Sequence, residues 1–228
     1  MVKDLVVVGS GGLNIVRLIE DINANKKTYN FLGFLEKDPT KHGTEVLGYP
    51  ILGGDDLLLS ELKKCTVINN VMGTPRLHEI ITLNLREKYG VNEFPNLIHP
   101  NVNMRGVTIG EGNIIYANSL LEPLCSIGDF NILFRAVVAH ETEVGNYNLM
   151  AASTIGSRTK VGSYNLFGNG CFVANSCPVG DDNVIGVASV VMRPVKSGQR
   201  LLGNPAIDMG EFIHTYMRKK KNMNRYKS

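Results

Sequence analysis

The stretch that decides the fold runs from residue 109 to residue 191: IGEGNIIYANSLLEPLCSIGDFNILFRAVVAHETEVGNYNLMAASTIGSRTKVGSYNLFGNGCFVANSCPVGDDNVIGVASVV. Counted in sixes, with two steps shortened to five residues, it has an apolar side chain at fifteen successive unit positions, and glycine follows eight of them. The positions are Ile109, Ile115, Leu121, Ile127, Leu133, Ala139, Val144, Met150, Ile155, Val161, Phe167, Val173, Val179, Ile185 and Val191. In a chain with 43% hydrophobic residues, such a run would arise by chance roughly a few times per million.

This period of six predicts a parallel β-helix. Each unit supplies one short strand and one corner, its apolar side chain points into a triangular prism, and three units complete a coil of about 18 residues. Fifteen units therefore make about five coils, which stack about 4.8 Å apart. Glycine after the apolar residue suits a tight corner. An immunoglobulin-like sandwich is the alternative, but it would show strict two-residue alternation and strands of unequal length.

Residues 5 to 89 follow a different pattern, in which strands and helices alternate. Strands are expected at Leu5–Val8, Tyr29–Leu35 and Cys65–Met72, and helices at Ile15–Ile22 and Pro75–Tyr89. This order predicts a small parallel, Rossmann-like sheet with helices packed on it.

The chain is therefore expected to have three parts: an α/β domain over 1–95, an all-β domain over 96–205, and a C-terminal helix with a basic tail over 206–228. Residues 217–228 hold six Lys or Arg and no acid, so residues 1–216 carry 18 basic and 21 acidic side chains. No basic stripe with interleaved aromatic residues precedes the tail. A solvated terminus is therefore expected, and no nucleic-acid partner.

Composition favours a cytoplasmic globular protein. The 228 residues are enough for one or two compact cores. The four cysteines lack C-x-x-C spacing, so neither a disulfide scaffold nor a metal site is expected. The first apolar run is only Leu5 to Val8, and no window approaches 18 apolar residues. Neither a cleavable signal nor stable membrane insertion is expected.

A set of ordered landmarks extends over most of the chain. They are Gly9-Ser10-Gly11-Gly12, Gly33-Phe34-Leu35-Glu36-Lys37-Asp38, Gly48-Tyr49-Pro50-Ile51-Leu52-Gly53, Met72-Gly73-Thr74, Ile98-His99-Pro100, Ala136-Val137-Val138-Ala139-His140-Glu141 and Gly203-Asn204-Pro205-Ala206. In these landmarks the sequence resembles the hexapeptide-repeat acyltransferases, in particular the sialic acid O-acetyltransferase and nucleotide-4-amino-sugar N-acetyltransferase family. The resemblance implies a left-handed β-helix, a homotrimer, and acetyl-CoA bound as cosubstrate between adjacent prisms.

His140 is the only histidine inside the repeat, and it is the candidate general base. Acyl transfer from a thioester needs a base for the attacking amine or hydroxyl and a donor for the oxyanion that forms. In the sixfold count His140 lies where five residues replace six, and such a shortened corner would turn its side chain outward. The resemblance also implies that His140 is the catalytic histidine and that Glu141 raises its basicity.

The acyl and coenzyme contacts follow from the resemblance alone. Many relatives have a second histidine nine residues after the first, where this chain has Leu149. The amide of Asn148 beside it, or backbone N–H groups of corner glycines, are the expected substitutes. For the coenzyme, the resemblance implies contacts at Gly168, Asn169, Gly186 and Val187.

In the N-terminal half, Gly11, Gly12 and Leu13 lie between a strand and a helix, where backbone N–H groups and the helix dipole can hold a pyrophosphate. The third glycine of G-x-G-x-x-G is replaced by Asn14, which disfavours NAD. The resemblance implies that Glu36 and Lys37, with Gly73 nearby, hold the nucleotide of a sugar. Relatives have histidine at the position of Leu13.

The sequence thus predicts an acetyl-CoA-dependent N-acetyltransferase that acts on a nucleotide-linked amino sugar in surface-glycan biosynthesis. An O-acetyltransferase of the sialic acid type is the close alternative, because the same base serves an amine or a hydroxyl. A non-catalytic trimeric scaffold is the alternative from another class. The residues Leu13 and Leu149 favour it, and the His140-Glu141 pair argues against it.

Overall fold

The computed structural model describes residues 2–210. Its N-terminal layer is a five-stranded sheet of order β3-β4-β2-β1-β5, parallel except for the hairpin of β3 and β4. The strands are β1 (Lys3–Val8), β2 (Tyr29–Leu35), β3 (Glu45–Val46), β4 (Tyr49–Gly53) and β5 (Thr66–Asn69). The sequence pattern indicated β1, β2 and β5 and did not indicate the hairpin.

Two α-helices flank this sheet, α1 (Asn14–Asn25) and α2 (Pro75–Tyr89), and two short 3-10 helices lie at Pro39–Lys41 and Asp55–Leu59. The start of α2 is capped, because the Thr74 hydroxyl accepts a hydrogen bond from the Leu77 N–H at 3.1 Å. Its end is marked by Gly90, which has a φ of 69° that favours glycine. The start of α1 has no side-chain cap.

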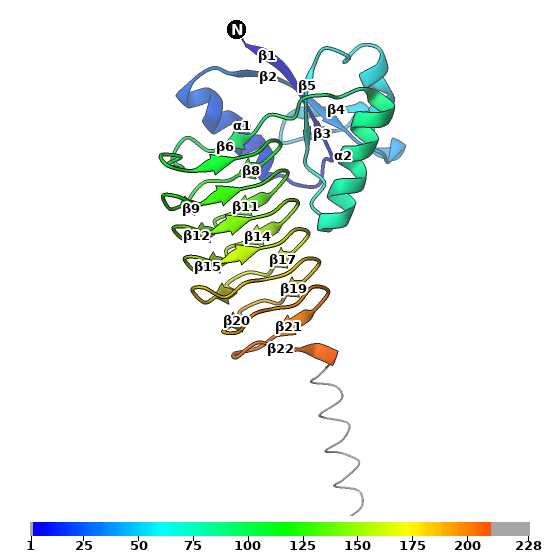
Figure 1. The fold of residues 1–228 in the computed structure, drawn as a ribbon. Coiled ribbons are helices and arrows are strands. Elements are labelled where there is room, and N and C mark those ends of the chain that lie inside the picture. Colours follow the sequence, from blue (N-terminus) through cyan, green and yellow to red (C-terminus); the bar gives the residue numbers. More distant parts are fainter. Residues whose placement is uncertain (1, 211–228) are drawn as a thin grey trace, which may run out of the picture.

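The remainder of the described chain is a parallel β-helix that extends away from the α/β layer (Figure 1). Its three faces follow one another along the chain in every coil. Face I holds β7 (Thr108–Ile109), β10 (Ser126–Ile127), β13 (Glu143–Val144) and β16 (Lys160–Val161). Face II holds β6 (Leu97–Ile98), β8 (Ile114–Ile115), β11 (Ile132–Phe134), β14 (Leu149–Ala151), β17 (Leu166–Phe167), β19 (Val184–Ile185), β21 (Arg200–Leu202) and β22 (Ile207–Asp208). Face III holds β9 (Leu120–Leu121), β12 (Val137–Val138), β15 (Thr154–Ile155), β18 (Phe172–Val173) and β20 (Val190–Val191).

The interior of the prism is one apolar cluster, and it confirms the sixfold count at all but one of the fifteen positions. Nearly all of them are buried there, and Ile109 is partly buried against the same cluster. The exception is Ala139, because the buried residue of that unit is Val138, which pairs with Ile155 in β15. The five-residue step therefore separates Leu133 from Val138. The corner that carries His140 has the ordinary length, so the expectation of a shortened corner there was wrong.

The corner glycines allow close stacking of the coils rather than an unusual backbone angle. Gly128 and Gly145 are absent from the positions with positive φ. A Cβ built on Gly128 would lie 2.8 Å from the carbonyl oxygen of Gly145, and one on Gly145 would lie 2.8 Å from that of Gly162. The left-handed corner positions are instead occupied by side-chain-bearing residues such as Glu141 and Arg158, with φ of 56° and 55°.

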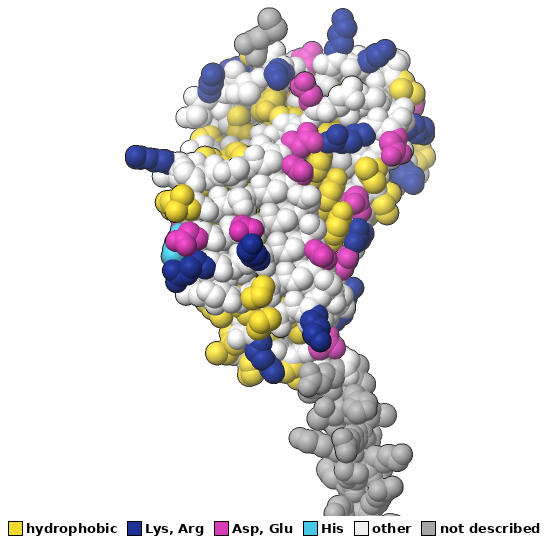
Figure 2. Space-filling view, viewed as in Figure 1, with side chains coloured by type: hydrophobic (Ala, Val, Ile, Leu, Met, Phe, Trp, Pro, Cys, Tyr) yellow, Lys and Arg dark blue, Asp and Glu magenta, His cyan; other side chains and the backbone are white. Residues whose placement is uncertain are grey.

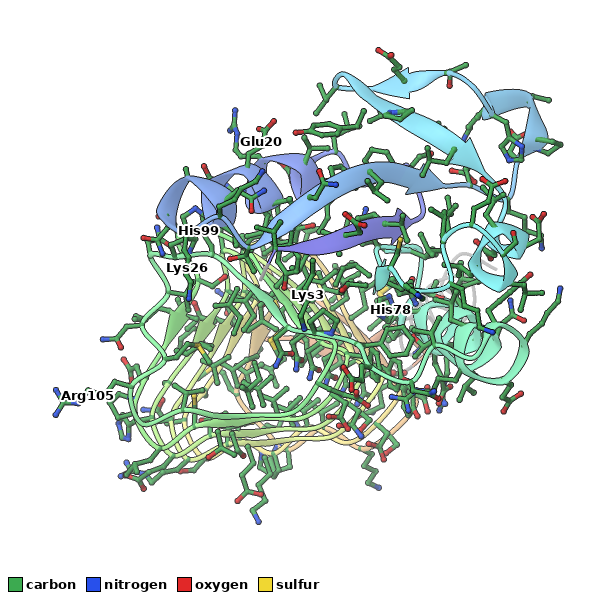
Figure 3. The ribbon with its side chains drawn as sticks, turned by 90° about the horizontal axis from the view of Figure 1, so that it is seen from above. Lys3, Glu20, Lys26, His78, His99 and Arg105 are labelled. Carbon is green, nitrogen blue, oxygen red and sulfur yellow. The ribbon has the colours of Figure 1, made fainter. Side chains whose placement is uncertain are left out.

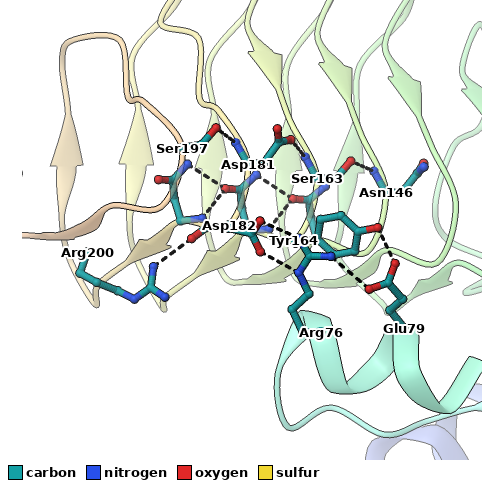
Figure 4. Close-up of polar contacts among 12 residues, drawn as sticks. Arg76, Glu79, Asn146, Ser163, Tyr164, Asp181, Asp182, Ser197 and Arg200 are labelled. Carbon is teal, nitrogen blue, oxygen red and sulfur yellow. Dashed lines mark hydrogen bonds and ion pairs between the residues drawn. The ribbon is translucent and has the colours of Figure 1, made fainter.

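Two ladders of polar side chains tie the coils together along the edge between faces I and II. The first, here called the asparagine ladder, consists of Asn113, Asn131, Asn148, Asn165 and Asn183, all buried. Each side-chain oxygen accepts the backbone N–H of the next member at 2.8–2.9 Å. The second is exposed and runs through Asn146, Ser163, Asp181 and Ser197 (Figure 4).

Helix α2 runs along the same edge and fixes the α/β layer to the prism. Phe130, Tyr147 and Tyr164 stack there, with ring centroids 5.0 and 5.5 Å apart. The Arg76 guanidinium lies 3.5 Å from the centroid of the Tyr164 ring and pairs with Asp182 at 2.6 Å (Figure 4). This contact places the start of α2 beside the later coils.

The last expected part, residues 206–228, falls largely on residues 211–228, which lie outside the described residues. Its first residues form β22, which pairs antiparallel with β21, and a helix begins at residues 209–210. Acidic and basic side chains alternate over the face of the molecule in Figure 2. None of the helices in the described part of the chain has the length and apolarity to cross a membrane.

Candidate functional site

The glycine-rich loop after β1 presents free backbone donors at the start of α1. Gly12 approaches Asn70 so closely that a Cβ would lie 2.6 Å from the amide nitrogen of Asn70, which donates to the carbonyl oxygens of Gly9 and Gly12 at 3.3 Å. Within residues 2–210, the N–H groups of Gly11, Gly12 and Leu13 have no hydrogen-bond partner. Uncapped N–H groups at a helix start form an anion site when a ligand supplies the acceptor.

Glu36 lies beside this loop, at the carboxyl end of β2. It accepts hydrogen bonds from the backbone and the hydroxyl of Ser10, and from the backbone of Lys37 at 3.0 Å. Burial raises the pKa of Glu36, but the bonds from Ser10 and from the backbone of Asp38, together with the charge of Lys41, outweigh burial. The pKa therefore lies below its ordinary value and Glu36 is a carboxylate at neutral pH.

Gly73 completes the same edge of the sheet. It is exposed between β5 and the Thr74 cap of α2, and a Cβ there would lie 3.1 Å from the side chain of Leu77. Because the strands are parallel, their carboxyl ends meet at one edge. The structure thus brings together the loop of Gly11 to Leu13, the Glu36-Lys37 turn and Gly73.

His140 lies at the edge between faces III and I, with its side chain 44% exposed. Its Nδ1 is 3.4 Å from Oε1 of Glu141. Within residues 2–210, Nε2 has no hydrogen-bond partner. A carboxylate at Nδ1 favours the tautomer whose Nε2 carries the lone pair, so the outward-facing nitrogen can accept a proton.

Glu122, which sequence reasoning missed, fixes the backbone of this corner. Its side chain accepts a hydrogen bond from the backbone N–H of His140 at 2.8 Å. The spacing of 18 residues, one full coil, is the signal that could have identified it.

The described residues give no support for metal chemistry at this site. No group of three His, Cys, Asp or Glu side chains among residues 2–210 could hold a metal ion.

Gly168, Asn169, Gly186 and Val187 lie on a different edge, between faces II and III. A Cβ on Gly168 would lie 2.8 Å from the backbone nitrogen of Val187, so the two corners are stacked directly. Asn169 and Val187 are exposed. Face III separates this edge from His140, so a single chain does not bring the two groups together.

Solved structures of known proteins resemble this fold. No protein-family model and no curated protein matches the sequence. PerB from Caulobacter crescentus, in complex with CoA and GDP-perosamine, superimposes with a TM-score of 0.78 at 27% identity, over 91% of this chain and 98% of that chain. The acetyltransferase domain of PglB from Neisseria gonorrhoeae, in complex with acetyl coenzyme A, gives 0.80 at 25% identity, over 92% and 100%. These neighbours are acetyltransferases, which is consistent with the family that the sequence landmarks resemble.

A third neighbour, WeeI from Acinetobacter baumannii, shares 22% identity with a TM-score of 0.77, over 90% of this chain and 99% of that chain. At that identity it supports the fold of the family and nothing further. Together the three neighbours extend over both the α/β layer and the β-helix.

In this structure, Asn148 is not placed to be a coenzyme ligand, which corrects the expectation from the sequence. Its side chain is 1% exposed and belongs to the asparagine ladder. The amide nitrogen donates to Asn131 and Gly162 at 3.0 Å, and the amide oxygen accepts from Asn165 at 2.9 Å. With every polar atom engaged, Asn148 has no donor left for an acyl carbonyl.

Leu149 takes the position of the second histidine of the relatives. It lies on face II, where it packs against the apolar cluster shared with the α/β layer, next to Ile132. It therefore does not lie on the edge of its own chain that carries His140.

Asn148→Ala should lower the free energy of unfolding by about 3 kcal/mol, because it removes the acceptor of the buried backbone and side-chain donors of Asn165 and the donor to the Gly162 carbonyl. The melting temperature should fall by roughly 5–10 °C. Asn169→Ala is the matched control, because Asn169 is exposed, and it should change stability by less than about 0.5 kcal/mol. Equal melting temperatures for the two variants would contradict the ladder as a source of stability.

Proposed function

We propose that this protein transfers the acetyl group of acetyl-CoA to the amino group of a nucleotide-linked amino sugar in surface-glycan biosynthesis. The observation that carries the proposal is the His140-Glu141 pair, exposed at an edge of a prism whose 27% identical neighbour PerB is in complex with CoA and GDP-perosamine. As the amine attacks the thioester carbon, Nε2 of His140 takes its proton. The C–S bond then breaks, and the CoA sulfur leaves with that proton.

The nucleotide is assigned to the carboxyl edge of the sheet. Free N–H groups of Gly11, Gly12 and Leu13 hold the pyrophosphate, and Glu36, Lys37 and Gly73 line the nucleoside pocket. Because residue 13 is leucine where relatives have histidine, no imidazole contacts the phosphates there, and the backbone N–H groups bind them. This assignment is supported by the free donors and by the ionised Glu36 described above.

The working unit is proposed to be a homotrimer of left-handed prisms, with acetyl-CoA between neighbours. Gly168, Asn169, Gly186 and Val187 would line the coenzyme groove on one protomer and His140 would come from the next. Two observations support this. His140 and the coenzyme corner occupy different edges of one chain, and Leu120 and Phe172 are exposed apolar side chains on face III. Backbone N–H groups of corner residues would stabilise the oxyanion in place of the second histidine, which this chain lacks.

The test is release of CoA thiol from acetyl-CoA with UDP-, dTDP- and GDP-linked 4-amino sugars and with free sialic acid, followed by product mass. A gain of one acetyl group on an amino sugar is expected. Acetylation of sialic acid alone would replace the proposal with the O-acetyl reaction. If no thiol is released and the protein also fails to bind CoA, the proposal is overturned in favour of a non-catalytic scaffold.

A further inference from the structure

A pocket of about 290 Å³ lies between α1 and the first two coils of the β-helix. It is lined from α1 by Asn14, Arg17 and Asp21, and from the prism by His99, Tyr116 and Arg135. Its volume is at the lower end of the range for small-molecule sites. Asn14 directly follows the glycine-rich loop in the sequence. In Figure 3, His99 lies beside α1, where the chain enters the prism.

The polar atom that points to a ligand is the hydroxyl of Tyr116. The residue is 5% exposed, and its hydroxyl oxygen is buried without a hydrogen-bond partner. Buried tyrosine hydroxyls are normally paired, because an unpaired one loses its hydration without replacement. Burial also raises the pKa of Tyr116 well above its ordinary value, so the group is a donor that needs an acceptor oxygen.

Two arginines supply positive charge to the same pocket from opposite sides. Arg17 comes from α1 and Arg135 from the corner between β11 and β12, and within residues 2–210 neither has an ion pair or a side-chain hydrogen bond. The carboxylate that could neutralise them is engaged, because Oδ2 of Asp21 lies 3.1 Å from Nε2 of His99. Two free guanidinium groups match the geometry of a carboxylate or phosphate.

Arg135 occupies the left-handed position of the corner between β11 and β12, with a φ of 52°. Its guanidinium lies 5.1 Å from the centroid of the Phe134 ring, which also lines the pocket. The side chain is thus held at the pocket rather than dispersed in solvent.

We propose that this pocket binds an oxyanion carried by a sugar, a carboxylate or a phosphate, which Arg17 and Arg135 clamp while the Tyr116 hydroxyl donates to a sugar oxygen. The pocket then selects acidic sugars and sets the substrate class of the enzyme. The inference rests on the proposed function only for the expectation that the ligand is a sugar.

The test measures binding by calorimetry, without acetyl-CoA, of glucuronate, glucose 1-phosphate and neutral glucose to the full chain. Glucuronate or glucose 1-phosphate should bind and glucose should bind at least about tenfold more weakly. Stronger binding of glucuronate would assign the anion to the sugar ring, and stronger binding of glucose 1-phosphate would assign it to the phosphate. Equal affinity for all three sugars would overturn the proposal.

Arg17→Gln and Arg135→Gln should each weaken binding of the anionic sugar by about tenfold or more, and Tyr116→Phe by a few-fold. Both arginines are exposed, so these variants should keep the melting temperature of the parent. Arg105→Gln removes an equal charge from a side chain that projects away from the body (Figure 3) and should bind like the parent. Arginine variants with unchanged affinity would contradict the site, whether or not the protein acetylates any sugar.

Discussion

Replacing His140 with alanine should lower kcat for acetyl transfer by about 10²- to 10⁴-fold, the usual range for loss of a general base. The imidazole is exposed, and its one side-chain contact among residues 2–210 is with Glu141 at 3.4 Å. The melting temperature should therefore stay within about 1 °C of the parent, because removal of an exposed side chain leaves no cavity. Thiol release at saturating substrates measures the first quantity and calorimetry the second.

Glu141→Gln tests the second residue of the pair, and its effect should be smaller. It keeps the corner and the hydrogen bond to Nδ1 but removes the negative charge that stabilises the imidazolium, so it should lower kcat less than His140→Ala does. Arg105→Gln, two coils away on the same edge and without a hydrogen bond to either residue among residues 2–210, should leave kcat unchanged. Full turnover by His140→Ala would remove His140 from the mechanism. A large loss of melting temperature would assign it a structural role instead.

The repeat could be predicted because every unit must bury one apolar residue, which imposes a period on the sequence. The register failed only at Ala139, where Ala136, Val137, Val138 and Ala139 are four apolar residues in succession. Periodicity alone cannot decide which of them faces inward. The pairing of Val138 with Ile155 on the next coil decides it, and that pairing is a long-range property.

That Gly11, Glu36 and Gly73 lie at one edge could be predicted for a similar reason, because the carboxyl ends of parallel strands meet at one edge. Their role toward a nucleotide came from the resemblance alone and stays a prediction. The role of Asn148 was missed because sequence reasoning treated its amide as a substitute for the missing second histidine. The signal was present, since asparagine recurs at spacings of 17 or 18 residues along the ladder.

The pocket between α1 and the prism could not be predicted from the sequence. Arg17 and Arg135 are more than a hundred positions apart, and nothing local distinguishes either from a solvated surface arginine. They come together because α2 holds the α/β layer against the prism through Arg76, Tyr164 and Asp182. Side chains that meet only through the packing of two domains leave no periodic signal.

Val161→Asp should unfold the β-helix or lower its stability by more than about 4 kcal/mol, because it places an unpaired carboxylate inside the prism. Val161 is 5% exposed and lies in the apolar cluster between the positions of Val144 and Val179 on adjacent coils. A loss of this size corresponds to a fall in melting temperature on the order of 10 °C or more. Calorimetry with circular dichroism measures it.

The matched control moves the same aspartate by one residue. Lys160 precedes Val161 in β16, but its side chain points outward and is 76% exposed, with a 3.3 Å ion pair to Glu143. Lys160→Asp loses that surface pair and should cost no more than about 1 kcal/mol. Because both variants carry an aspartate in the same strand, strand propensity cannot account for the difference between them, and only the inward direction of Val161 can. A folded Val161→Asp protein with the melting temperature of Lys160→Asp would contradict the assignment of alternate residues to the inside and outside of the prism.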